Sequence, residues 1–427
     1  MGTRAATLPL QVVASALITF LTIRSIGVAA FATVGLLLSL PGLFGFLNLG
    51  TSASVSNAAG ESLALGIDHL TRVSVTATRM TFLAGGILIP LSGIVALLGW
   101  WPYILGKGDP KLLTFGALAA TVAVALLQPL GQGVTVLMAT GHTVSATVLT
   151  VAPTLVALGL VFGATVGNSP PILFVICPFL AQVIVAILSC WIATRTLGLS
   201  LRTLTGYVIH KGFRGAGIKH EARPALVTWI LLPLAYQTDR LLISHLSTSS
   251  QLASYNLAAQ IFGAIFSIVA VGSSSLWGHY ARARISNSLP GPREFTRLSL
   301  AFAGVGAVFG IGYVIATPFV TSVVSDHQVG VSSLCLVCFG VLLVVQSFHQ
   351  PSAMLQTNKS GLWFNAGAVA VMTVVNLGLG LILTRPLGAA GPVLASVIAL
   401  TIGLALPSFI RARLTLVRVQ MPVINVS

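Results

Sequence analysis

Long runs of apolar residues, interrupted by charges and by Gly and Pro clusters, dominate the hydropathy pattern of this chain. A helix needs about 20 apolar residues to cross a bilayer, and the pattern yields twelve segments of about that length. Between Leu112 and Thr194 there is no Asp, Glu, Lys or Arg at all. The predicted segments are 7–23, 26–48, 81–105, 112–137, 144–166, 171–193, 224–246, 252–277, 298–320, 331–350, 364–384 and 387–410.

Composition supports a polytopic, all-α integral membrane protein. Only 7% of the 427 residues are charged and 56% are hydrophobic, and this charged fraction is far below that of soluble globular domains. Arg4 followed by an apolar run is also typical of a secretory signal, but eleven further segments follow and no small-residue cleavage site stands out. We therefore expect the first segment to be a retained helix.

Basic residues indicate the orientation. Most Arg and Lys residues fall into alternate connections, chiefly 195–223 and 282–297, and into the stretches flanking the first and last apolar segments. Because basic residues are retained on the cytoplasmic side, both termini are predicted to be cytoplasmic in a multi-pass cell-membrane protein. The net charge of +15 follows from this bias and favours anionic lipid as a partner; its spread over many loops gives no indication of nucleic acid.

The chain repeats itself. Short matches recur at a nearly constant separation, which predicts two six-helix lobes in the same orientation, a parallel repeat of the kind found in transporters. The predicted domains are 1–193, an N-terminal lobe; 194–223, a basic cytoplasmic linker; 224–410, a C-terminal lobe; and 411–427, a cytoplasmic tail. The matches pair residues 22–24 with 238–240, 31–33 with 252–254, 50–52 with 272–274, and 138–143 with 355–360.

Two charges stand inside the apolar stretch 224–246, Asp239 and Arg240. Charged groups at membrane depth are costly and usually mark a substrate or ion path. Gln237 lies one helical turn before Arg240 and shares its face, and the repeat makes Arg24 the equivalent of Arg240. Two plainer interpretations stay open: Arg24 extends to the outer headgroups, or Arg240 only pairs with Asp239.

Amide side chains extend this candidate binding surface. Asn48 ends the second segment, and Asn256 and Gln260 share one face of the eighth. Each is also explained by ordinary interhelical hydrogen bonding. Gly306 and Gly310 form a small-residue face that predicts close helix packing.

No constellation typical of an enzyme occurs in the sequence. The seven acids are scattered, no nucleotide-binding motif is present, and the histidines lack metal-ligand spacing. The four cysteines lie within apolar segments, where they are expected to be small buried hydrophobes, so we predict no metal, no cofactor and no disulfide. A secondary transporter is the class that remains.

Several motifs resemble the polysaccharide branch, including Wzx-type flippases, of the multidrug, oligosaccharidyl-lipid and polysaccharide (MOP) flippase superfamily. The chain departs from that pattern at Asn48, where members often have Asp, and in its twelve segments, where many have fourteen. The matching stretches are 31–50 with its closing Asn-Leu-Gly, 239–244, 253–262, 376–377 and 385–391.

This resemblance implies alternating-access export of a polyprenyl-pyrophosphate-linked oligosaccharide from the inner to the outer leaflet, with a polysaccharide polymerase or glycosyltransferases as further partners. Arg24 and Arg240 would then hold phosphate or a charged sugar group, and Gln237 and Asn48 would form a polar wall. Three alternatives stay open. A multidrug exporter of the same fold would favour acidic residues over Arg at membrane depth. A major-facilitator carrier has a short charged connection where this chain has residues 52–80, and a membrane polymerising enzyme needs a large outer loop.

Overall fold

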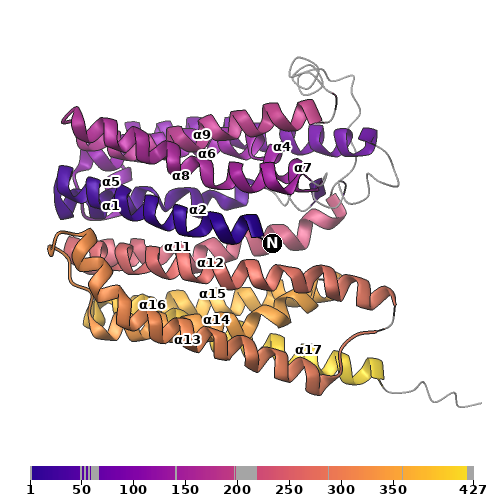
Figure 1. Ribbon diagram of the computed structural model, residues 1–427. Coiled ribbons are helices and arrows are strands. Elements are labelled where there is room, and N and C mark those ends of the chain that lie inside the picture. The colour runs from indigo at the N-terminus through magenta and orange to yellow at the C-terminus, as the bar shows by residue number, and fades with distance from the viewer. Residues whose placement is uncertain are drawn as a thin grey trace, which may run out of the picture. The chain divides into compact units, whose positions relative to one another are not determined.

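The computed structural model describes residues 2–48, 51, 54–55, 58, 67–139, 142–196, 198, 219–286, 288–357 and 359–420, some of them by their backbone alone. Within these residues the secondary structure is helical and contains no strand, as the apolar segments predict (Figure 1). The first half comprises α1 (Gly2–Leu37), α2 (Leu40–Leu43), the 3₁₀ turn η1 (Phe44–Asn48), α4 (Ile67–Leu97), α5 (Trp101–Leu105), α6 (Pro110–Leu130), α7 (Gln132–Ala139), α8 (Thr143–Val166) and α9 (Pro171–Thr196).

Six long helices follow in the second half. The last of them is continuous through a π-helical turn, η2 (Thr401–Ala405), which joins α16 to α17. The elements are α11 (Lys219–Leu246), α12 (Ser249–Ile285), α13 (Pro292–Val324), α14 (Ser333–Leu355), α15 (Lys359–Leu387), α16 (Ala390–Leu400) and α17 (Leu406–Gln420).

Ten helical stretches of the described chain are long and apolar enough to cross a membrane, against twelve predicted segments. One of the ten, Pro9–Leu43, covers the first two predictions. Inside it, Gly27 has φ 78° and ψ 168°, a conformation that glycine adopts readily and that interrupts the helix at the start of the second predicted segment. The seventh prediction corresponds to α11, which is helical but carries several charges and is not among the ten.

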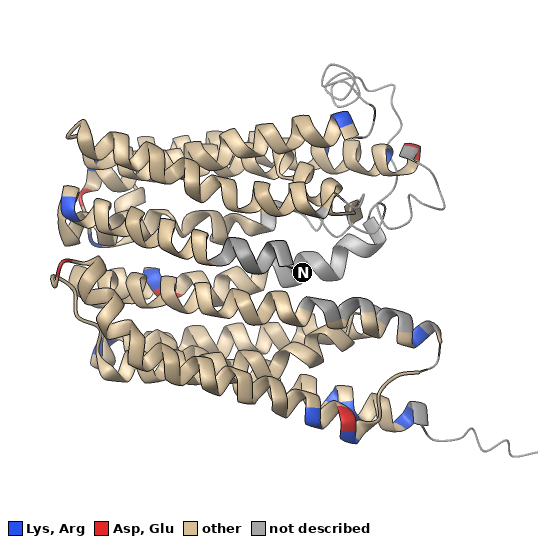
Figure 2. Cartoon of the chain, viewed as in Figure 1, with Lys and Arg blue, Asp and Glu red and all other residues tan. Residues whose placement is uncertain are grey.

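Helix ends differ from the predicted boundaries because apolar length measures the lipid-embedded part of a helix only. The third prediction begins at residue 81, whereas α4 begins at Ile67 and includes Asp68, Arg72 and Arg79. Likewise α17 continues to Gln420, through the first part of the predicted tail. Figure 2 shows that charged stretches lie mainly towards helix ends and that long central stretches carry none.

The chain divides into two compact units: Met1–Pro233 with Val324–Gln328, and Leu234–Val323 with Val329–Ser427. In the first, a cluster of buried side chains that includes Leu70, Leu137 and Leu149 joins α4, α7 and α8. In the second, Tyr280, Phe295 and Leu416 belong to one buried cluster. The predicted lobe limits, 1–193 and 224–410, stay a prediction, and most of the predicted linker lies outside the described residues.

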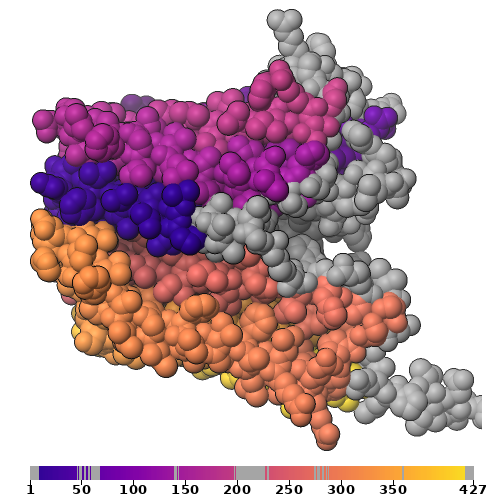
Figure 3. Space-filling view, viewed as in Figure 1, coloured from indigo at the N-terminus to yellow at the C-terminus, as the bar shows by residue number. Residues whose placement is uncertain are grey.

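Helix α13 has the polarity expected of a helix in lipid. Val308, Ile315 and Phe319 are 70%, 73% and 72% exposed, while Gly306, Gly310 and Thr317 on the opposite face are buried. Water would disfavour so continuous an exposed apolar face, and lipid favours it. Figure 3 shows the outward side of this helix in orange on the visible face of the second unit.

The predicted role of the α13 glycines is confirmed. A Cβ built on Gly310 would lie 2.7 Å from the Gly340 carbonyl oxygen, and one on Gly306 would lie 2.7 Å from Ser347 Oγ. Only residues without a side chain allow α13 and α14 to approach this closely.

Candidate functional site

The two charges predicted at membrane depth lie on α11, in the second compact unit. Successive residues of a helix point about 100° apart, so Asp239 and Arg240 face different neighbours. Asp239 is 4% exposed and Arg240 is half-buried. Their hydrogen bonds define two groups of side chains, which we call the arginine group (Gln237, Arg240 and Asn256) and the aspartate group (Asp239, Tyr255, Asn376 and Ser396).

In the arginine group, two amides hold the guanidinium. Arg240 Nε donates to Asn256 Oδ1 at 2.9 Å, and Arg240 Nη1 donates to Gln237 Oε1 at 2.7 Å. The second bond confirms that Gln237 and Arg240 share a helix face. The guanidinium carbon also lies 5.6 Å from the centroid of the Tyr255 ring, within range of a cation–π interaction.

In the aspartate group, the hydrogen-bond partners of the carboxylate are hydroxyl groups. Tyr255 donates its hydroxyl to Asp239 Oδ2 at 3.1 Å, and Ser396 Oγ donates to the same oxygen at 3.4 Å. Asn376 Nδ2 lies 3.2 Å from Ser396 Oγ and also donates to the Ala235 carbonyl at 2.7 Å. Helices α11, α12, α15 and α16 therefore converge on one buried carboxylate.

The two groups bear on the alternative in which Arg240 only neutralises Asp239. Within the described part of the chain, no hydrogen bond or ion pair joins the two side chains, although their opposite charges still attract each other from adjacent positions. A guanidinium carries five N–H donors, and the two bonds to Asn256 and Gln237 use two of them. The remaining donors are suited to a ligand with several acceptor oxygens, such as a phosphate.

The other predicted site residues are placed as follows. Gln260 lies one helical turn after Asn256 on α12 and is half-buried. Arg24 lies on α1 in the first unit, where it is exposed and its guanidinium is 5.9 Å from the centroid of the Phe20 ring. Asn48 is the last residue of η1, and its side chain lies outside the described part of the structure.

The sequence did not identify three residues of the aspartate group as site candidates. Tyr255 is 4% exposed, and Asn376 and Ser396 are each 2% exposed. Each is a polar residue in a largely apolar helix, and such residues are also common in ordinary helix packing. Nothing in the one-dimensional pattern shows that they meet at Asp239, because they lie on three other helices and the sequence does not encode which helix faces pack together.

Metal-binding side chains do not gather in the described residues. No group of three or more His, Cys, Asp and Glu lies close enough to hold a metal ion there. The four cysteines are free thiols, and Cys177, Cys335 and Cys338 are buried. The Asp239 carboxylate, with the oxygens of Ser396 and Asn376, provides the hard ligands that suit a proton or a small cation.

A bundle of lipid-exposed helices with hydrogen-bonded charges at membrane depth is typical of membrane transport proteins. No family model matches the sequence, and no curated protein matches it either. Solved structures do match over nearly the whole chain. An inward-facing multidrug resistance MATE family transporter of the MOP superfamily has a TM-score of 0.72 at 13% identity and covers 98% of each chain.

Two further structures extend the comparison. The lipid II flippase MurJ, in an inward closed conformation, has a TM-score of 0.67 at 14% identity and covers 98% of this chain and 91% of its own. A MOP superfamily transporter from Pyrococcus furiosus has a TM-score of 0.55 at 12% identity over 96% of both chains. At this identity the likeness establishes the fold, which is that of MOP superfamily transporters, and the neighbours are transporters and flippases.

Proposed function

We propose that this chain is a transporter that flips a polyprenyl-pyrophosphate-linked oligosaccharide from the inner to the outer leaflet by alternating access, in the synthesis of cell-surface polysaccharide. The observation that carries the proposal is the arrangement of Arg240. Arg240 lies in a predicted membrane segment, is held by two neutral amides, and forms no ion pair with Asp239 among the described residues. A half-buried cation without an ion pair favours an anionic cargo.

Phosphate is the part of this cargo that the arginine group recognises. A planar guanidinium can donate two parallel hydrogen bonds to phosphate oxygens, whereas an ammonium acts as a point charge. Gln237 and Asn256 fix the orientation of the guanidinium, which reduces the entropy lost on binding. Gln260, on the same helix as Asn256, is suited to hydrogen bonding with sugar hydroxyls. In the first unit, Arg24 and Asn48 stay candidates for cargo binding.

Asp239 serves this site indirectly in our proposal. Its bonds to Tyr255 and Ser396 tie α11 to α12 and α16, so it positions the helix that carries Arg240. Tyr255 also lies beneath the guanidinium and connects the two groups. A change in the protonation or cation occupancy of the aspartate group would thereby reach Arg240 through a shared neighbour.

The fold comparison supports a transport activity. The proposed cargo is argued from the side chains around Arg240. MurJ shows that the fold occurs in a flippase of a lipid-linked substrate, and the Pyrococcus furiosus transporter is described as having a binding pocket of reverse polarity that suggests a different function. A multidrug exporter is the competing function, given the MATE neighbour. A cationic drug would be repelled by Arg240, which favours the flippase.

Binding of undecaprenyl pyrophosphate to the purified protein in nanodiscs tests the cargo. Arg240→Ala should abolish saturable binding, and Arg240→Lys should retain part of it, because charge remains but the planar fork is lost. Undecaprenol, which lacks the pyrophosphate, is the control ligand. Equal binding of both lipids, or unchanged binding by Arg240→Ala, would contradict the proposal.

A second variant separates cargo binding from neutralisation. If Arg240 only compensates Asp239, the double change Asp239→Asn with Arg240→Gln should restore folding and activity together, since no buried charge is left. Our proposal expects a protein that accumulates in the membrane and neither binds the pyrophosphate nor restores surface polysaccharide in flippase-deficient cells. Accumulation of cationic dyes in the same cells tests the competing function, drug export. If the chain exports cationic drugs, Arg240→Ala should not impair that export, because the arginine repels a cation.

A further inference from the structure

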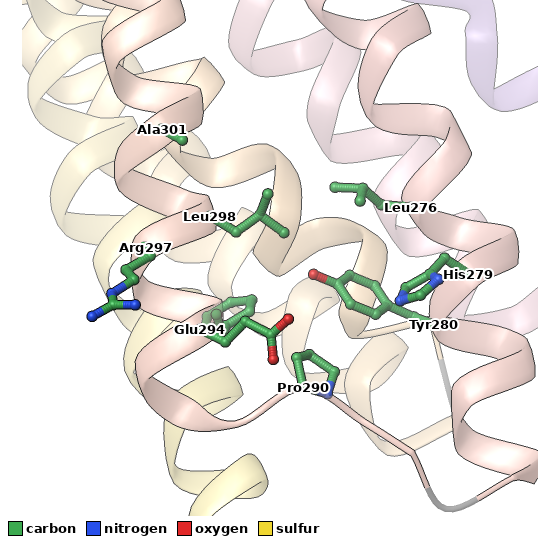
Figure 4. A pocket seen from close by; sticks show the side chains of 9 residues that line it. Leu276, His279, Tyr280, Pro290, Glu294, Arg297, Leu298 and Ala301 are labelled. Carbon is green, nitrogen blue, oxygen red and sulfur yellow. The ribbon is translucent and has the colours of Figure 1, made fainter.

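A pocket of about 380 Å³ lies in the second unit, between the end of α12 and the beginning of α13. Its wall is largely apolar and includes Leu276, Phe295 and Leu298. Figure 4 shows Tyr280 and Glu294 directed towards the same space from the two helices, whereas the Arg297 guanidinium points away from it.

Tyr280 brings a hydroxyl without a partner into this pocket. The residue is 1% exposed, and its hydroxyl has no hydrogen-bond partner in the described part of the chain. Most buried hydroxyls are hydrogen-bonded, so an unsatisfied one calls for an explanation, such as a ligand. Burial and the nearby charge of Glu294 raise the pKa of Tyr280 to about 12, and the phenol therefore stays protonated at neutral pH.

Glu294 supplies a negative charge in otherwise basic surroundings. Arg297 is near it in sequence, yet its guanidinium points away from the pocket (Figure 4). Arg284, on the end of α12, is engaged elsewhere, with the Leu355 carbonyl and Thr357 Oγ1. The pocket thus combines a carboxylate, an aromatic ring and an apolar wall, which together favour an ammonium group attached to an apolar body.

Depth in the membrane indicates the source of such a group. Tyr280 lies near the end of α12, which finishes at Ile285, and Glu294 lies in the first turn of α13. Arginine residues cluster at these two helix ends, as is typical of the region where helices meet lipid headgroups. The connection between the predicted segments 252–277 and 298–320 carries four Arg residues and is predicted to be cytoplasmic, which assigns the pocket to the inner leaflet.

We propose that this pocket binds the primary ammonium headgroup of a phospholipid, phosphatidylethanolamine, from the inner leaflet. The ammonium donates hydrogen bonds to the Glu294 carboxylate and to the Tyr280 hydroxyl oxygen, and the glycerol end of the lipid lies against Leu276, Phe295 and Leu298. Phosphatidylcholine carries a quaternary ammonium without N–H donors and cannot make these bonds. This site is independent of the proposed cargo and goes beyond it.

Native mass spectrometry of the full chain, released from nanodiscs of mixed phosphatidylethanolamine, phosphatidylcholine and phosphatidylglycerol, measures which lipid is retained. We expect phosphatidylethanolamine to be enriched over phosphatidylcholine. Glu294→Gln should lower the enrichment roughly tenfold, since hydrogen bonds to charged groups are the stronger ones. The matched control is Asp326→Asn, which also removes an exposed acid but lies outside the pocket and should leave the enrichment unchanged.

Tyr280→Phe provides a readout that does not depend on Glu294. Without phosphatidylethanolamine the variant should be at least as stable as the natural protein, because an unsatisfied hydroxyl is gone. With that lipid, the natural protein should gain more in melting temperature than the variant. Equal retention of ethanolamine and choline lipids would overturn the proposal, and so would an unchanged enrichment in Glu294→Gln. If octylammonium displaces the bound lipid and the protein shows no preference among the phospholipids, the site binds soluble amines and the proposal is wrong.

Discussion

Arg240 and Asn256 are joined by a 2.9 Å hydrogen bond from the guanidinium Nε to the amide oxygen, across the interface of α11 and α12. Asn256 is 5% exposed, so the bond is formed mostly away from solvent. It fixes the orientation of the guanidinium, and because the amide is neutral it does not cancel the positive charge. The same helix pair carries the Tyr255–Asp239 bond on the neighbouring residues.

Replacing Asn256 tests whether the charge of Arg240 matters for cargo. Asn256→Asp should place a carboxylate against the guanidinium and reduce binding of undecaprenyl pyrophosphate more than Asn256→Ala does, because it cancels the charge that attracts phosphate. Equilibrium binding in nanodiscs measures both. Asn365→Asp is a suitable control, since it adds the same charge on α15 where Asn365 bonds to Ser408. Full binding by Asn256→Asp would rule out an electrostatic role for Arg240.

Loss of the Tyr255 hydroxyl tests the aspartate group. Tyr255→Phe removes a bond to a buried carboxylate and should lower the free energy of unfolding by roughly 1.5–3 kcal/mol, whereas Tyr313→Phe removes a neutral bond to the Ala258 carbonyl and should cost roughly 0.5–1.5 kcal/mol. Unfolding by denaturing detergent in mixed micelles measures the difference. In an Asp239→Asn background the cost of Tyr255→Phe should fall, since the charged acceptor is gone. Equal costs in both backgrounds would show that the Tyr255 hydroxyl stabilises something else.

Close packing of α13 against α14 predicts opposite effects for neighbouring glycines. Gly310→Ala should destabilise the protein by about 1–3 kcal/mol, because its Cβ would meet the Gly340 carbonyl at 2.7 Å. Gly312→Ala, on the same helix with nothing within 4 Å of its Cβ, should be neutral or stabilising by up to about 1 kcal/mol through helix propensity. The same detergent unfolding assay applies. A harmless Gly310→Ala would mean that the two helices are farther apart.

Topology follows from the basic loops and is tested by fusions. A reporter that is active only outside the cytoplasm should be active after Gly108 or Ser249 and silent after Gly215 or Ser288, because Arg and Lys hold their loops inside. Gly108, Ser249 and Ser288 lie at or next to helix ends in the structure, so a fusion there leaves the preceding helices intact. Activity at Ser288 would refute both the predicted orientation and the inner-leaflet assignment of the Tyr280 pocket.

The sequence by itself determined the class of fold. Apolar length, scarcity of charge and the small-residue face of α13 are local properties, and each predicted segment is helical over most of its length. It also determined that Asp239, Arg240 and Gln237 are unusual, since charge and amide at membrane depth are costly wherever the helix packs. The Gln237–Arg240 contact was predictable because a three-residue spacing fixes it within one helix.

Only the tertiary structure decided how those charges are satisfied. Asp239 meets Tyr255, Asn376 and Ser396 because α11, α12, α15 and α16 pack together, and no spacing along the chain encodes which helix faces which. The pocket at Tyr280 depends in the same way on two helix ends and on their distance from the hydrocarbon. Helix formation is governed by short-range periodicity, whereas side-chain partnership across helices depends on packing, which the linear pattern does not contain.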